Sequence, residues 1–446
     1  MTANISATAS QISVLAQADP NSVVETFRRL RRYRDDGRWL AKANVYGTDT
    51  VDRIRTDRQG SQINGKHLAE YISASTVLHM ADGWGFLGRA MQAHLIGDYA
   101  VARHLSYYAE LRAAMSILAC NGVGVFSGWN YVVTGPRSIV EVAPKSPTHQ
   151  FTWAALHWWA QSQGSWKLIG DSVRPYGVPV GDWLSLASGY SAWGAVASDW
   201  ITSLGLDIQR VADDQESRNI ASYRPNRLIA GKKASERVDV SFAVDLWRSL
   251  EPSVTGFSVL DIHILRITLE RAFEGVEGKK PCNAAADFEN LVDTVVGQMS
   301  DESVRQRVKS FLLRKTESAD HPVFAYAALD TEATDPQHHL QLMSRSALLL
   351  ALATSSCRLL VERAGLTLRD HEFWWNALGT DRGIWTTAPP SEDLRDLWED
   401  INVELEDVES WVAGGASTRV DFIEACPRAF SRLSYFELVA LWGIPA

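Results

Sequence analysis

The sequence predicts a mainly α-helical protein made of two helical-bundle domains, with a small β-hairpin insertion near residues 122–143. Three observations support this fold class. Apolar residues recur at three- and four-residue steps through most of the chain, one short stretch alternates instead and is β-branched, and one polar stretch without periodicity divides the chain. With 446 residues, 46% of them hydrophobic and 17 of them tryptophan, the chain can bury large cores.

The clearest single element is a helix expected between Asp98 and Gly122, with Tyr107 and Tyr108 at its centre. Asp98 is a favourable N-cap and Gly122 a favourable C-cap. The expected buried face follows the spacing of a helical core stripe. Its members are Val101, Leu105, Tyr108, Met115 and Leu118.

Before that helix we expect a flexible arm, residues 1–20, and then helices over 22–40, 67–80 and 86–96. The 22–40 segment is rich in arginine: Arg28, Arg29, Arg31, Arg32, Arg34 and Arg38. Such a run forms either a solvated basic face or a contact with phosphate or an acidic partner.

After Gly122 the period changes from helical to alternating. Val123, Val125 and a second β-branched run after Tyr131 surround a turn at Gly135-Pro136, which predicts a hairpin or meander. A tryptophan-rich helix is expected over 148–163, and further helices over 183–204 and 212–223. One functional option is a pocket for a small molecule, lined by the tryptophans of the 148–204 region.

Residues 226–239 are polar and lack periodicity, so they predict the boundary between an N-terminal domain, 21–235, and a C-terminal helical domain, 240–446. The C-terminal domain has six main predicted helices: 259–273, 284–299, 303–314, 339–364, 391–411 and 419–442. The 391–411 helix is strongly acidic but keeps an apolar stripe, Leu394, Trp398, Ile401, Leu405 and Val408. We expect this stripe to dock while the carboxylates face water or a basic partner.

Net charge, cysteine spacing and the length of the apolar runs argue against several classes of protein. A net charge of −9 argues against coating nucleic acid by charge alone. The four cysteines are far apart and form no CxxC pair, which excludes a zinc ribbon and favours a reducing compartment. No signal peptide is expected, and the longest apolar run, 347–354, is too short to span a bilayer. The expected localisation is therefore cytoplasmic, away from membranes.

No motif completes a metal or cofactor site. His149 and His157 are too far apart on one helix to share a metal, and HExxH is absent. Asp213-Asp214-Gln215-Glu216 resembles half of the acidic magnesium motif of terpene cyclases, with its fourth acidic position one residue short. An acidic cluster at a helix N-terminus is the simpler interpretation. We therefore expect neither a metal nor a cofactor.

Two segments together resemble the HEPN superfamily, helical bundles of bacterial toxin–antitoxin and phage-defence systems. The helix around Tyr107-Tyr108-Ala-Glu110 is similar to an early core helix of such bundles, and Arg218 followed by Asn219 matches the start of the family's downstream motif. The family places a histidine four to six residues after that arginine, and Tyr223 stands there in this sequence. The resemblance covers about residues 65–235.

The family motif works as a nuclease because arginine holds a phosphate while histidine moves protons near neutral pH. Tyrosine titrates near pH 10, so Tyr223 is a poor substitute. The expected function is a non-catalytic interaction subunit of a cytosolic bacterial complex, with phage defence as the setting that the resemblance implies. The alternative is a metal-independent HEPN endoribonuclease that acts as a dimer through Arg218, Asn219 and Tyr223. Protein partners are expected, with RNA binding and a homodimer left open.

Overall fold

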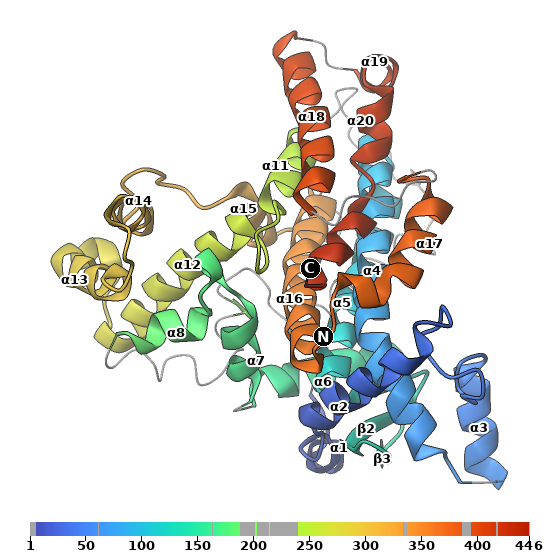
Figure 1. Ribbon diagram of the computed structural model, residues 1–446. Helices are drawn as coiled ribbons and strands as arrows, with labels where there is room; N and C mark the ends of the chain where they lie inside the picture. Colours follow the sequence, from blue (N-terminus) through green and yellow to red (C-terminus); the bar gives the residue numbers. More distant parts are fainter. Residues whose placement is uncertain are drawn as a thin grey trace.

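The computed structural model describes residues 6–60, 62–162, 164–187, 201–202, 214, 240–332, 335, 337–385, 394–415 and 418–445. The fold is mainly helical with one small antiparallel sheet, as the sequence predicts (Figure 1). The first half contains α1 (Ala9–Leu15), α2 (Pro20–Arg29), η1 (Leu30–Tyr33), α3 (Thr50–Gly60), α4 (Gly65–Leu95), α5 (Tyr99–Cys120), β1 (Val123–Phe126), β2 (Trp129–Gly135), β3 (Ser138–Val142), α6 (Thr148–Ala160), α7 (Ser165–Ser172), η2 (Pro175–Gly177) and α8 (Val180–Ser185).

The second half continues with shorter helices around one long one. It contains α11 (Ser241–Ser249), α12 (Ser258–Glu277), η5 (Pro281–Asn283), α13 (Ala285–Val296), α14 (Glu302–Leu312), α15 (Pro322–Ala327), α16 (His338–Ala364), η6 (Leu368–His371), α17 (Glu372–Arg382), α18 (Leu394–Ala413), α19 (Arg419–Ala425), α20 (Pro427–Arg432) and η7 (Phe436–Gly443).

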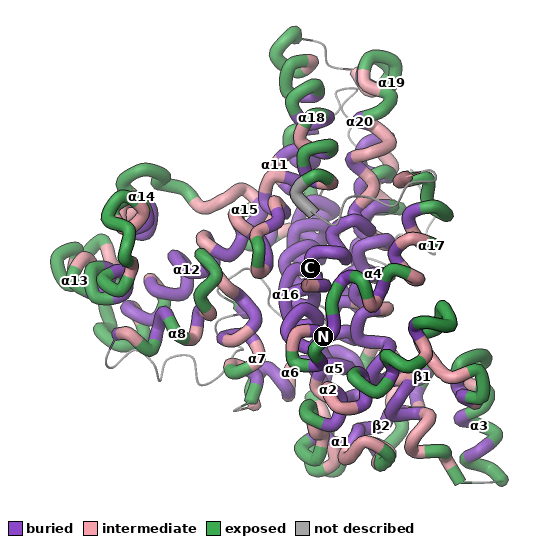
Figure 2. Tube along the Cα trace, in the orientation of Figure 1, coloured by how far each residue is buried: buried purple, intermediate pink, exposed green. Residues whose placement is uncertain are grey.

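Three long helices form the centre of the molecule. α5 packs against α4 on one side and α16 on another, and η7 lies against both α4 and α16. Figure 2 shows these helices as the most continuously buried part of the chain. Polar contacts tie them together: Trp84 on α4 donates to the Thr354 hydroxyl on α16 at 2.9 Å. The two halves of the chain therefore share one core.

The shared core contains helices from both sides of the predicted domain boundary. The boundary expected at 226–239 lies outside the described residues. α16, which corresponds to the helix predicted over 339–364, packs on α4 and α5 of the N-terminal half. Among the described helices, α16 alone is long and apolar enough to cross a bilayer, and its most apolar window is wholly buried inside the protein.

The predicted helices 67–80 and 86–96 are one continuous helix, α4. The glycines between them are used for close packing rather than as breaks. A side chain on Gly88 would collide with the carbonyl oxygen of Ser434, and one on Gly83 would press against Leu350. Small residues let η7 and α16 approach the α4 backbone, which compensates for the lower helix propensity of glycine.

The helix between Asp98 and Gly122 is confirmed as α5, and the Asp98 side chain accepts a hydrogen bond from the Val101 amide. The expected buried face is only partly correct. Met115 and Leu118 are buried, but Leu105 and Tyr108 are half-buried and Val101 is 40% exposed. Tyr107 is fully buried instead. Because α4, α16 and α6 all pack on α5, no single stripe defines its interior face.

The Tyr107 hydroxyl connects α5 to α6. It lies 2.8 Å from His149 Nδ1 and accepts a hydrogen bond from Trp153 Nε1 at 3.3 Å. We expect Tyr107→Phe to lower the free energy of unfolding by about 1–2 kcal/mol, because its buried partners lose a hydrogen bond. Tyr71→Phe is the matched control, since the Tyr71 hydroxyl has no hydrogen bond within the described residues. Urea unfolding of both variants tests this, and equal effects would contradict it.

The alternating segment forms a three-stranded antiparallel meander in the order β1-β2-β3, as expected for residues 122–143. Val132 pairs with Val123 on one side and with Val140 on the other.

The N-terminal residues expected to form a flexible arm contain α1, which has a capping box between Thr8 and Gln11. Gln11 also donates to the Pro144 carbonyl, which fastens α1 beside β3.

The arginine-rich helix expected over 22–40 is shorter than predicted. α2 ends at Arg29, η1 follows, and the chain then turns at Gly37, whose φ is +69°. The turn brings Trp39 onto Phe373 and Trp374, with ring centroids 5.5 and 5.7 Å apart. The end of the arginine-rich segment therefore faces α17.

The acidic helix docks as predicted. In α18, the predicted docking residues Trp398, Ile401 and Leu405 are buried, whereas the Leu394 side chain lies outside the described residues. Of the other apolar residues in this run, Val408 is buried and Leu397 is partly buried. The helix expected over 419–442 is instead three short ones, α19, α20 and η7. Pro427 removes a backbone donor and begins a new helix, which explains the first interruption.

Candidate functional site

The residues that carry the HEPN resemblance are only partly described. Arg218, Asn219 and Tyr223 lie outside the described residues, as does Asp213. Asp214 is described and buried, and it pairs with Arg345 at 2.9 Å. Glu110 lies on the other side of Arg345, and burial, with Asp214 nearby, raises the Glu110 pKa well above its usual range. Within the described residues no group of three His, Cys, Asp or Glu could hold a metal ion.

Three tryptophans of the tryptophan-rich segment belong to the hydrophobic core. Trp153, Trp159 and Trp183 are each at most 4% exposed. The Trp183 indole donates to the Pro175 carbonyl at 3.2 Å, as a packed tryptophan usually does. Residues 188–200 of this segment lie outside the described residues.

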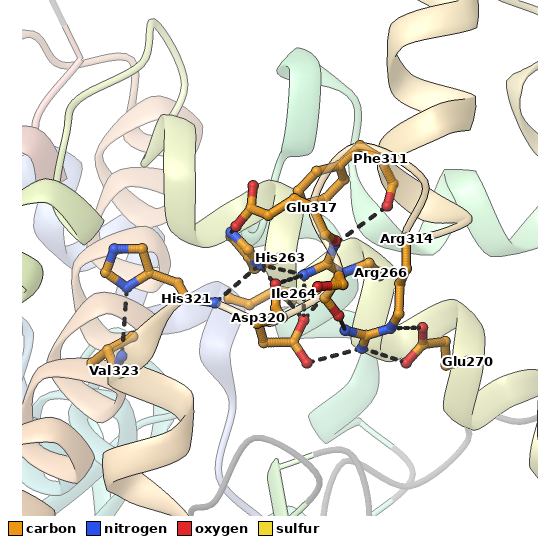
Figure 3. A network of polar contacts seen from close by, with 12 residues as sticks. His263, Ile264, Arg266, Glu270, Phe311, Arg314, Glu317, Asp320, His321 and Val323 are labelled. Carbon is orange, nitrogen blue, oxygen red and sulfur yellow. Dashed lines mark hydrogen bonds and ion pairs between the residues drawn. The ribbon is translucent and has the colours of Figure 1, made fainter.

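A dense polar network joins α12 to the loop after α14 (Figure 3). Arg266 is completely buried, and its guanidinium donates to Asp320 Oδ1 at 2.7 and 3.0 Å. It also donates to the carbonyls of Phe311, Glu317 and Ala319. Arg314 adds a bidentate pair with Glu270, at 2.6 and 2.8 Å, and reaches Asp320 Oδ2 at 2.9 Å.

This network is a structural clamp, because its buried charges already have partners. Burial by itself would raise the pKa of the Asp320 carboxyl, but the contact with His263 and pairing with Arg314 and Arg266 lower it well below its usual range. His263 Nδ1 accepts from Arg266 at 3.1 Å, which leaves its proton on Nε2 toward Glu317. Arginines paired in this way hold the loop in place.

The arginines of the arginine-rich segment differ in the contacts that they form. Arg28 donates to the carbonyls of Arg363 and Ala364 and so caps the C-terminus of α16. Arg29 pairs with Glu25, and Arg32 lies 3.5 Å from Glu70. These three arginines are exposed, and each contacts another part of the chain or a neighbour on its own helix.

Arg34 stands apart from the other arginines. It is only 4% exposed, and its Nε, Nη1 and Nη2 atoms are buried with no hydrogen-bond acceptor among the described residues. The guanidinium lies over the rings of Phe27, at 4.8 Å, and Trp39, at 5.6 Å. Burial lowers the pKa of Arg34 to about 10, so it stays charged at neutral pH. A buried cation without acceptors is unfavourable unless something else supplies them.

Arg34 lines an open cavity of about 870 Å³ between the end of η1 and the η6–α17 segment. We call this cavity the arginine groove, and its lining residues are Arg31, Arg34, Asp35, Arg369, Asp370, Glu372, Phe373, Asn376, Ala377, Thr380 and Asp381. Arg31 Nε pairs with Asp370 at 2.9 Å across the groove. Arg369 is exposed and has no ion pair within the described residues.

His371 forms part of the wall behind Arg34. Its ring stacks on Phe27 at 6.1 Å and tilts against Trp39 at 5.6 Å. Burial and the nearby Arg34 charge lower the pKa of His371 to about 3, so the ring is neutral. Nδ1 lies 2.8 Å from the Thr367 carbonyl and donates to it, which fixes the tautomer. The groove therefore keeps its positive charge on arginine side chains alone.

The sequence indicated one wall of this groove and missed the other. Arg31 and Arg34 belong to the segment for which a phosphate or acidic contact was one interpretation. Arg369 and Asp370 had no such signal, because their stretch has no special periodicity and lies far away in the chain. A charged and aromatic run, Arg369 to Trp374, was the only local hint.

Comparisons of the chain with protein-family models, with curated proteins and with solved structures found no match.

Proposed function

We propose that the chain is a non-catalytic interaction subunit of a cytosolic bacterial complex, and that it holds its partner through the arginine groove. The observation that carries the proposal is Arg34, a buried guanidinium without an acceptor that lines an open groove. Because the Arg34 nitrogens are shielded from solvent in this structure, the proposal includes a turn of this side chain toward the groove, where an anionic group on a partner would supply the missing acceptors. The phage-defence setting comes from the HEPN resemblance.

The test is recovery of a partner from the native host with tagged chains. We expect a partner to co-purify with the wild-type chain and to be lost with Arg34→Gln, because glutamine lacks the charge and the planar fork. Arg38→Gln is the matched control, since Arg38 is exposed, belongs to the same segment and does not line the groove. Recovery that is the same for both variants would contradict the proposal.

The nuclease alternative is tested on the same preparations. We expect the purified chain not to cleave a mixed RNA pool, because Tyr223 replaces the family's histidine. Robust cleavage that Arg218→Ala abolishes would overturn the subunit proposal in favour of the nuclease.

A further inference from the structure

We propose that the arginine groove binds the phosphate monoester of a phosphorylated peptide whose neighbouring residues are basic. This inference rests on the proposed function and names the chemistry of the partner segment that the groove holds. Within the described residues, two features of the groove carry it: a cationic end formed by Arg34, which has no acceptor, and Arg369, and carboxylates without ion pairs in the same lining.

The cationic end fits a dianion better than a carboxylate. Arg34 has five N–H donors and no acceptor among the described residues, and Arg369 is exposed in the same lining. A carboxylate offers two oxygens and a single charge, and Asp370 already fills that role for Arg31. A phosphate monoester offers three acceptor oxygens and a charge of about −1.5 to −2 at neutral pH.

The cationic end also coincides with the start of a helix. α17 has 11 residues and begins at Glu372, three residues after Arg369. The dipole at a helix N-terminus favours an anion, and it adds to the arginine charges there.

The rest of the lining argues against a nucleic acid. Asp35, Glu372 and Asp381 are exposed and form no ion pair within the described part of the chain. RNA and DNA carry a negative charge on every nucleotide, so further phosphates would meet these carboxylates. A peptide with lysine or arginine beside its phosphorylated residue matches both the arginines and the carboxylates.

The length of the groove agrees with a short extended segment. From Glu372 to Asp381, α17 rises about 14 Å at the usual helical spacing. About four residues of extended peptide span that distance. The half-buried Phe373 ring lies in the same lining and offers an apolar surface to the peptide.

The test is fluorescence polarisation of the full chain with degenerate peptide pools. The first pool has a fixed phosphoserine followed by two lysines, the second has serine in place of phosphoserine, and the third has aspartates in place of the lysines. We expect the first pool to bind, and binding to fall about tenfold or more in Arg34→Gln but not in Arg38→Gln. Arg34→Lys, which keeps the charge but loses the fork, should recover only part of the affinity.

Each contrary result has a definite meaning. Equal binding of the first two pools, or no binding of the first, overturns the phosphate proposal. Tighter binding of a 5′-phosphorylated RNA that depends on Arg34 replaces the peptide with nucleic acid and also overturns it. The proposed function fails separately, when a partner recovered from the host is indifferent to Arg34. If that partner depends on Arg34 but phosphatase treatment does not release it, the function stands and the phosphate inference fails.

Discussion

Arg266→Met is expected to lower the free energy of unfolding by about 3–5 kcal/mol, because it removes one partner of a buried ion pair. Asp320 would lose its shortest contact with Arg266, at 2.7 Å, and three backbone carbonyls would lose their buried donor. Thermal and urea unfolding measure the change. Hydrogen exchange in residues 314–321 should accelerate, since Arg266 holds this loop on α12.

Arg271→Met is the control for this prediction. Arg271 lies on the same helix but is half exposed and, within the described part of the chain, pairs only with Glu274, so its removal should change stability by less than about 0.5 kcal/mol. The pH dependence gives a second check. The folded-state pKa of Asp320 is depressed, so its contribution is complete above about pH 4 and declines as the pH falls. The difference between wild type and variant should therefore shrink in acid.

Arg34→Met is expected to have the opposite sign and to stabilise the isolated chain by about 1 kcal/mol or more. Methionine can occupy the same buried space without the desolvation that a guanidinium suffers there. The contacts with the rings of Phe27 and Trp39 offset part of that desolvation, by about 0.5–2 kcal/mol. A raised melting temperature together with lost binding would mark Arg34 as a residue that serves the ligand rather than the fold.

Arg38→Met is the control for this prediction. Arg38 is exposed, so its replacement should leave the melting temperature nearly unchanged. If Arg34→Met destabilises the chain as an ordinary core truncation does, its aromatic contacts outweigh its desolvation. The groove would then have no unfavourable charge for a ligand to relieve.

Cap residues and the spacing of apolar residues were sufficient to predict those elements whose defining residues lie within one segment. The α5 helix has its cap residue and its length within one segment, and the apolar stripe of α18 is visible in an otherwise acidic run. The same patterns did not predict which side chains are buried where an element distant in the sequence packs on a helix. Tyr107 rather than Tyr108 is buried because α6 covers it, and no spacing inside α5 could show this.

The candidate site illustrates the same limit. Arg34 and Arg38 look alike in the sequence, since both are arginines near the end of one basic segment. Only the turn at Gly37 and the packing of Trp39 on Phe373 make one buried and leave the other exposed. The second wall comes from η6 and α17, so the groove could not be predicted from either segment alone.

The central position of α16 has a consequence for synthesis on the ribosome. Ser116 on α5 and Cys357 on α16 are 241 residues apart, yet their side-chain oxygen and sulfur atoms are 3.4 Å apart in the folded chain. At the usual rate of translation, α4 and α5 emerge on the order of tens of seconds before the helix that covers them. Their apolar faces are exposed to other nascent chains and to chaperones for that interval. The N-terminal half is therefore the part of this protein most prone to aggregate when translation stops early.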